Sequence, residues 1–117
     1  MLKFVATFAY SSGSWARMLQ TGEDRTASVA ALLEHFHGSL ESIYWEVETA
    51  SAHVIANLPD SISATAVIAA VTRTGAFKEV HVHEVLTQAQ LRDVVALART
   101  SEGVYRAPGA EVVETDF

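Results

Sequence analysis

Cysteine is absent from all 117 residues of the chain. That absence excludes disulfides, iron–sulfur ligation, thiol catalysis and cysteine-based zinc sites. Basic residues are also few: 8 Lys and Arg stand against 14 Asp and Glu, which gives a net charge of −6 with His neutral. A nucleic-acid surface needs a basic face to displace counterions from phosphates, and the sequence has no basic stripe. We therefore expect no nucleic-acid partner.

Hydrophobic runs long enough to span a membrane are also missing. The apolar segment 1–10 is followed at once by Ser11 and Ser12, and no basic region precedes it as in an export signal. This segment is typical of a strand, and we expect a cytoplasmic protein with no membrane partner. Hydrophobic residues make up 50% of the chain, which favours one folded domain with a modest core.

Hydrophobic periodicity predicts four strands and several helices. An apolar stripe at helical spacing runs from Val29 to Phe36, with Asp24 or Thr21 as the cap before it and Gly38 as its end. The expected strands are 2–10, 40–47, 53–58 and 77–86; the other expected helical segments are 15–20, 62–74 and 91–98, and 11–14 is expected to be a turn.

The element order strand–helix–strand–strand–helix–strand is the split β-α-β arrangement. Right-handed crossovers put both main helices on one side of an antiparallel sheet with strand order 4-1-3-2. The sequence therefore predicts a ferredoxin-like α+β domain over 1–100, whose last helix follows a capping box at Thr87 and Gln90. Residues 101–117 contain few core candidates, so we expect an extended tail that lies on a partner subunit.

Strand side chains alternate between the two faces of a sheet, and one set in each strand is apolar. The apolar set is expected to face the helices; it includes Phe4, Trp45, Val47, Val54 and Leu86. The other set is too apolar for plain solvated surface and too polar for ordinary core. A second copy of the same sheet would cover it and give a two-fold homodimer; the alternative is a monomer covered by its third helix and tail. This open face comprises Val5, Thr7, Tyr44, His53, Ile55, Asn57, His81 and His83.

Several short stretches match one known family. They are Gly-Ser-Leu-Glu-Ser-Ile-Tyr-Trp at 38–45, Asn-Leu-Pro-Asp at 57–60 before an Ala-rich helix, Thr-Gly at 74–75, and Leu-Thr at 86–87. Over residues 1–98 the chain thereby resembles the GYD domain family, small bacterial proteins with a dimeric α/β-barrel fold. The Gly-Tyr-Asp that names the family is expected near 49–53, where this chain reads Thr-Ala-Ser-Ala-His. The resemblance implies the fold and the dimer; the family has no settled activity.

The histidines are the first candidates for chemistry. His81 and His83 lie two apart on one strand, about 7 Å from each other, and could chelate one metal ion. His53 could be a third ligand, but it lies about 10 Å to the side because the first strand intervenes. The alternatives are polar members of an interface, or acid–base and hydrogen-bonding groups for a ligand. We assign no metal and no cofactor.

Arg25 has two interpretations: a surface ion pair with Glu23, or a side chain that opens onto a pocket and binds an anionic ligand. Tyr44 could place its hydroxyl in such a pocket or make a structural hydrogen bond. The candidates for a ligand pocket are therefore His53, Asn57, His81, His83, Tyr44, Thr7 and Arg25.

Three functions are compatible with these patterns. The first is a dimeric α/β-barrel protein that holds a small, mostly apolar molecule in a pocket on the open face. The second is a cofactor-free or metal-assisted oxygenase or isomerase that uses the histidines and Tyr44, by analogy with other proteins of that fold. The third is an interaction module whose tail clasps a partner. The sequence has no glycine-rich phosphate loop, nucleophile elbow or His-Glu-x-x-His motif, so it points to no specific reaction.

Overall fold

The computed structural model describes residues 1–109, which divide into two compact units, Met1–Val85 and a second that starts at Leu86. The expected domain, 1–100, therefore spans the first unit and the last helix. The elements of the first unit are β1 (Leu2–Tyr10), α1 (Ser12–Thr21), α2 (Arg25–His35), β2 (Ser39–Glu46), β3 (Ser51–Leu58), α3 (Ser61–Thr72) and β4 (Phe77–Val85).

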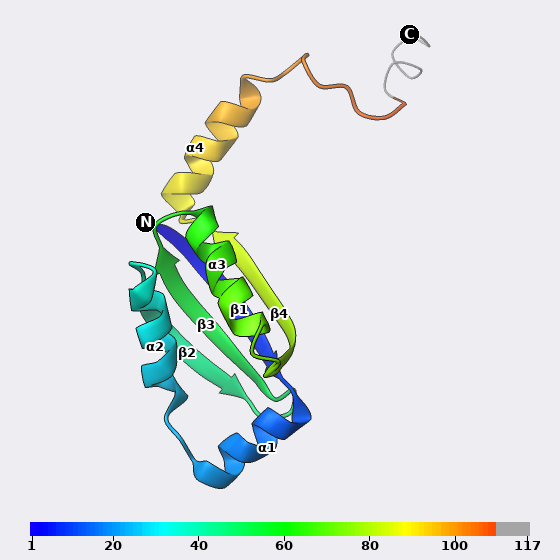
Figure 1. The fold of residues 1–117 in the computed structure, drawn as a ribbon. Helices are drawn as coiled ribbons and strands as arrows, with labels where there is room; N and C mark the ends of the chain where they lie inside the picture. Colours follow the sequence, from blue (N-terminus) through cyan, green and yellow to red (C-terminus); the bar gives the residue numbers. More distant parts are fainter. Residues whose placement is uncertain (110–117) are drawn as a thin grey trace. The chain divides into compact units, whose positions relative to one another are not determined.

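The four strands form one antiparallel sheet in the order β2-β3-β1-β4. This is the predicted order read from the opposite edge, and the β-α-β-β-α-β connection makes the unit a ferredoxin-like α+β fold. Helices α2 and α3 lie on the same face of the sheet (Figure 1). The other face carries no helix of this unit.

The helix-side face of the two central strands forms the core, as alternation predicts. Phe4, Val54 and Leu58 are buried there, together with Leu33 from α2 and Val67 from α3. Burial of this apolar set supplies the main driving force for docking the helices on the sheet.

Three residues expected in the core are exposed instead. Trp45 lies on the edge strand β2 and is 40% exposed, although its ring stacks on Tyr10 with centroids 6.1 Å apart. Val47 is 70% exposed because β2 ends at Glu46, and Leu86 is 46% exposed because β4 ends at Val85. The apolar pattern of the sequence continues past the last residue of the strand at Val47 and Leu86, whereas Trp45 lies within β2 and is exposed because β2 is an edge strand.

The predicted turn at 11–14 is wrong, because α1 already begins at Ser12. Ser11 is its N-cap, and its hydroxyl accepts the Ser14 backbone N–H at 3.3 Å. Asp24 caps α2 as predicted, accepting the Thr26 N–H at 2.9 Å. Gly38 does follow α2, but the left-handed residue at this end is His37, with φ 62°.

The second unit contains α4 (Gln88–Arg99). Its predicted capping box is present, with Thr87 as the cap and Gln90 reaching back to the cap backbone. Turns follow at 101–104, and residues 110–117 of the predicted tail lie outside the described residues. Within 1–109, no helix is long and apolar enough to cross a membrane.

Candidate functional site

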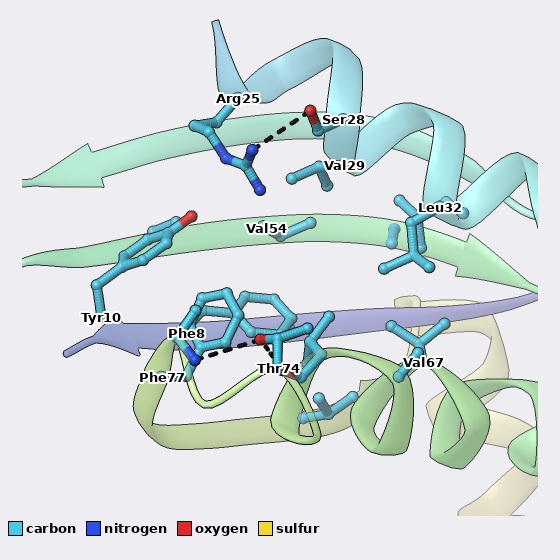
Figure 2. A pocket seen from close by; sticks show the side chains of 18 of the residues that line it. Phe8, Tyr10, Arg25, Ser28, Val29, Leu32, Val54, Val67, Thr74 and Phe77 are labelled. Atoms are coloured by element: carbon cyan, nitrogen blue, oxygen red, sulfur yellow. Dashed lines mark hydrogen bonds between the residues drawn. The ribbon is translucent and has the colours of Figure 1, made fainter. Parts of the chain in front are cut away.

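A cavity of about 410 Å³ lies between the helix-side face of the sheet and the helices of the first unit. Its floor is formed by β1, β3 and β4, and its walls by α1, α2 and α3. Figure 2 shows α2 on one side of this space and α3 on the other, with the strands between them. Apolar side chains dominate the lining; among them are Phe4, Phe8, Val29, Leu32, Val54, Leu58, Val67 and Phe77.

Small side chains explain why this space is open. Ala6 and Ala56 lie on the two central strands, and Ala64 and Ala70 lie on the facing side of α3. Protein interiors are close-packed, and larger residues at such positions would interdigitate and fill the layer between sheet and helix. The alanine methyl groups are too short to fill the space between α3 and the sheet, which leaves room for the cavity.

Polar groups also line the cavity. They are Tyr10, Arg25, Glu23, Arg17, Thr74, Ser14 and Ser28. In Figure 2 Tyr10 and Arg25 lie at one end, where Arg25 Nη1 donates to Glu23, and Leu32 and Val67 lie toward the other end. The cavity therefore has a polar end and an apolar body.

Arg25 is the first residue of α2, where the Asp24 cap fixes the start of the helix. Its Nη1 donates to Glu23 Oε2 at 3.3 Å and to Ser28 Oγ at 3.4 Å. The side chain is 31% exposed, and the rest of the guanidinium is directed toward the Tyr10 hydroxyl (Figure 2).

Tyr10 is 4% exposed at the end of β1. Its ring packs against Phe77, with centroids 4.6 Å apart, and against Trp15 and Trp45, each at 6.1 Å. Burial raises the pKa of the Tyr10 phenol, and the Arg25 guanidinium beside the hydroxyl opposes that shift. The phenol is therefore a neutral hydrogen-bond donor at neutral pH.

The open face of the sheet carries the predicted polar residues in cross-strand rows. Tyr44, His53, Thr7 and His81 form one row, and Ile55, Val5 and His83 belong to the next. In the first row, Thr7 Oγ1 lies 3.2 Å from His53 Nδ1, and His53 Nε2 lies 2.7 Å from Glu46 Oε1. Tyr44 is 64% exposed at the edge of this row.

The residue pattern of a known family also covers these elements. A GYD domain profile matches residues 4–95, which include the sheet except for the first two residues of β1, and all the residues that line the cavity. The chain belongs to the GYD domain family.

The fold comparison finds a crystal structure of an uncharacterized NIPSNAP domain protein from Burkholderia xenovorans. Its TM-score is 0.49 at 10% sequence identity, and the alignment covers 76% of this GYD domain chain and 96% of that chain. No curated protein matches the sequence.

The predicted site residues of this GYD domain protein fall on two opposite faces of the sheet. Arg25 lines the cavity; the other six, Thr7, Tyr44, His53, Asn57, His81 and His83, lie on the open face. The two groups do not form one site. Strand β1 separates His53 from the His81–His83 pair as expected, and no cluster of three His, Asp or Glu side chains suited to a metal occurs within 1–109.

Sequence reasoning missed the cavity and Tyr10. The histidines of the open face predict a pocket there, whereas the apolar residues of the helix-side face predict a filled core. The available signal was the alanine content of both layers: Ala6 and Ala56 belong to the strand set expected to face the helices, and Ala64 belongs to the expected Ala-rich helix. Small residues on two facing layers allow either close packing or a space between the layers, and in this structure they line a space.

Proposed function

We propose that this GYD domain protein binds a small, mostly apolar molecule in the cavity between its sheet and helices, and that it does so as a homodimer. The observation that carries the first part is the apolar space of about 410 Å³ with polar groups at one end. Ligand sites in proteins are typically concave, of about 300–1,000 Å³, apolar, and equipped with a few convergent polar groups.

The apolar lining of the cavity supports an occupant. The apolar side chains around this partly open space can contact water when it holds no ligand. An apolar molecule that takes the place of this water would gain about 25 cal/mol per Å² of apolar surface that it buries.

This proposal moves the pocket from the open face, where the sequence suggested it, to the helix-side face. The cavity lies beside Val54 and Ala56, whose side chains point away from those of His53 and Ile55 on the same strand. An oxygenase or isomerase that used the histidines would need its substrate on the open face, across the sheet from this cavity.

Binding can be tested with the neutral fluorescent dye N-phenyl-1-naphthylamine. Ala64→Leu/Ala70→Leu adds bulk on the cavity side of α3, and Ala66→Leu/Ala69→Leu adds the same bulk on residues of that helix that do not line the cavity. We expect the wild type and the Ala66/Ala69 variant to bind the dye, and the Ala64/Ala70 variant to bind it at least tenfold more weakly.

Circular dichroism and the melting temperature establish that both double variants are folded. The proposal is wrong if the folded wild type does not bind the dye, or if the folded Ala64/Ala70 variant binds it as well as the wild type does.

The homodimer is proposed on the open face. Val5 and Ile55 form a half-buried apolar centre on neighbouring strands. Polar pairs lie around it: Lys3 Nζ is 3.0 Å from Glu41 Oε1, and His81 Nε2 is 3.6 Å from Glu79 Oε2. An apolar centre within a polar rim is the usual anatomy of an interface, and a two-fold axis would pair the face with itself.

The dimer is tested by the mass in solution. We expect light scattering to give twice 12.6 kDa at micromolar concentration. Ile55→Lys places a charge at the centre of the face and should weaken association at least tenfold. Ile62→Lys, at a position on α3 that is 80% exposed, should leave it unchanged. A wild-type mass of 12.6 kDa across this range would exclude the dimer.

A further inference from the structure

We infer that the molecule in the cavity carries a carboxylate, which is held at the polar end by Arg25 and Tyr10. The inference rests on the proposed function and names the class of ligand: a carboxylic acid with an apolar tail. Arg25 and Tyr10 supply the recognition, and the apolar body of the cavity takes the tail.

The geometry of Arg25 is suited to this ligand. Both of its hydrogen bonds to side chains of α2 and the preceding loop use Nη1, with Glu23 at 3.3 Å and Ser28 at 3.4 Å. The remainder of the guanidinium is directed into the polar end of the cavity (Figure 2). A guanidinium presents N–H groups in a planar fork that matches the two oxygens of a carboxylate.

Tyr10 adds a second donor from a different element. Its hydroxyl points toward Arg25 from the end of β1, and its ring is fixed by contacts with Phe77 and the two tryptophans (Figure 2). Because the buried phenol stays protonated at neutral pH, it donates a hydrogen bond to an anionic oxygen. A guanidinium from α2 and a phenol from β1 thus lie together at this end of the cavity.

The local charge also favours an anion. Two guanidinium groups, Arg17 and Arg25, and one carboxylate, Glu23, line the cavity, which gives its lining an excess of one positive charge. The chain as a whole carries −6, so the lining differs in charge from the chain as a whole. The Glu23 side chain is 46% exposed, and so exposed an ion pair is weak. A ligand carboxylate can therefore take the place of the Glu23 carboxylate beside Arg25.

The tail of the ligand is accommodated by the body of the cavity. From the Arg25 end, the lining continues past Val29 to Leu32 on α2 and to Val67 on α3 (Figure 2). These side chains offer no hydrogen-bonding group, so the chain of a medium-length acid gains from leaving water there.

The test compares decanoate with 1-decanol, which has the same tail and no charge, as competitors of N-phenyl-1-naphthylamine at pH 7.5. We expect decanoate to bind the wild type at least tenfold more tightly than decanol. Arg25→Gln should abolish that preference, because it removes the charge and the paired N–H groups that hold the carboxylate and so weakens decanoate far more than decanol. Tyr10→Phe keeps the ring and should weaken decanoate severalfold. Arg73→Gln, at an exposed position outside the cavity lining, is the control and should behave as the wild type does.

The two proposals fail differently in this experiment. If the dye binds and is displaced equally by acid and alcohol, or if folded Arg25→Gln keeps the preference for the acid, the carboxylate inference is wrong and the cavity proposal stands. If the dye does not bind the wild type, the cavity proposal itself is wrong. Arg25→Lys serves as a second variant in case Arg25→Gln does not fold: it keeps the charge without the fork and should retain only part of the preference.

Discussion

At the scale of single residues, Gly38 allows the chain between α2 and β2 to lie close against β3. A Cβ added there would lie 2.3 Å from the Asn57 carbonyl oxygen and 2.7 Å from Leu58 Cδ2. The Gly38 N–H also donates to the Leu33 carbonyl at 2.8 Å, which holds the chain against the end of the helix. The glycine is therefore required by close approach to β3 and not by a left-handed backbone.

Gly38→Ala should lower the free energy of unfolding by about 1–3 kcal/mol, the usual cost of forcing extra atoms into a packed site. Gly13→Ala is the matched control. Gly13 lies in α1 and has ordinary space for a Cβ, 3.5 Å from Arg17 Nη1, so this change should stabilise the fold by up to about 1 kcal/mol. Urea unfolding of both variants measures the two effects; a neutral Gly38→Ala would contradict the packing argument.

Single residues also mark the limit of what the sequence predicts about the site. Two roles were open for Arg25 from the sequence, an ion pair with Glu23 or a place in a pocket on the open face. The structure contains the ion pair at 3.3 Å, and it places Arg25 in the lining of a cavity on the helix-side face instead. Tyr10 was not predicted as a site residue. The strand sequence gives no sign that the tyrosine at its end lies beside Arg25, 15 residues further along the chain. That contact depends on how α1 turns the chain back toward the sheet.

At the scale of elements, α3 forms one wall of the cavity with one of its sides and is exposed on the other side. It presents Val67 and two alanines to the sheet, and its opposite side carries Ile62, which is 80% exposed. Its start is set by Asp60, whose carboxylate accepts the Ser63 backbone N–H at 2.8 Å. This hydrogen bond lowers the pKa of Asp60 from 3.8.

The cap predicts a pH-dependent effect of Asp60→Ala. Because the folded state lowers this pKa, the stabilisation is present above 3.8 and is lost as the pH falls through the lowered value. Asp60→Ala should therefore melt a few degrees below the wild type at pH 7, and this difference should shrink below pH 3.8. Asp60→Ser caps without titrating, so its difference from Asp60→Ala should persist at low pH. Thermal melts of the three proteins across pH check this; a pH-independent gap between wild type and Asp60→Ala would contradict it.

Elements were also where sequence reasoning was most successful. Alternation in β1 and β3 and helical spacing in α2 predicted the element types and the two faces, and the order of the elements predicted the strand order. The cavity could not be predicted in the same way, because it depends on how two layers meet: alanines on β1, β3 and α3 matter only when they face one another. Strand ends were missed for a similar reason, since Val47 and Leu86 keep the apolar pattern beyond the last ladder hydrogen bond.

At the scale of the whole molecule, the proposed account gives the two faces of the sheet separate tasks. The helix-side face encloses the cavity, and the open face, with Val5 and Ile55 at its centre, is assigned to a second copy of the chain. Each subunit would then keep its own cavity, because the partner would lie on the far side of the sheet.

Dimerisation predicts that stability depends on protein concentration. Mass action favours the associated folded state, so the melting temperature of the wild type should rise when the concentration is raised from about 1 to 100 μM. Ile55→Lys should melt at a lower temperature than the wild type and show less of this dependence. Scanning calorimetry at several concentrations makes the measurement, and a wild-type melting temperature that does not change would argue for a monomer.

The central claim is that the space between the sheet and the helices holds a small, mostly apolar molecule. The most direct measurement is a crystal structure of the wild-type protein grown with decanoic acid. The account predicts continuous electron density for the acid between α2 and α3, in contact with Leu32 and Val67. A structure in which side chains close this space, or in which the acid lies on the open face beside His53, would contradict it.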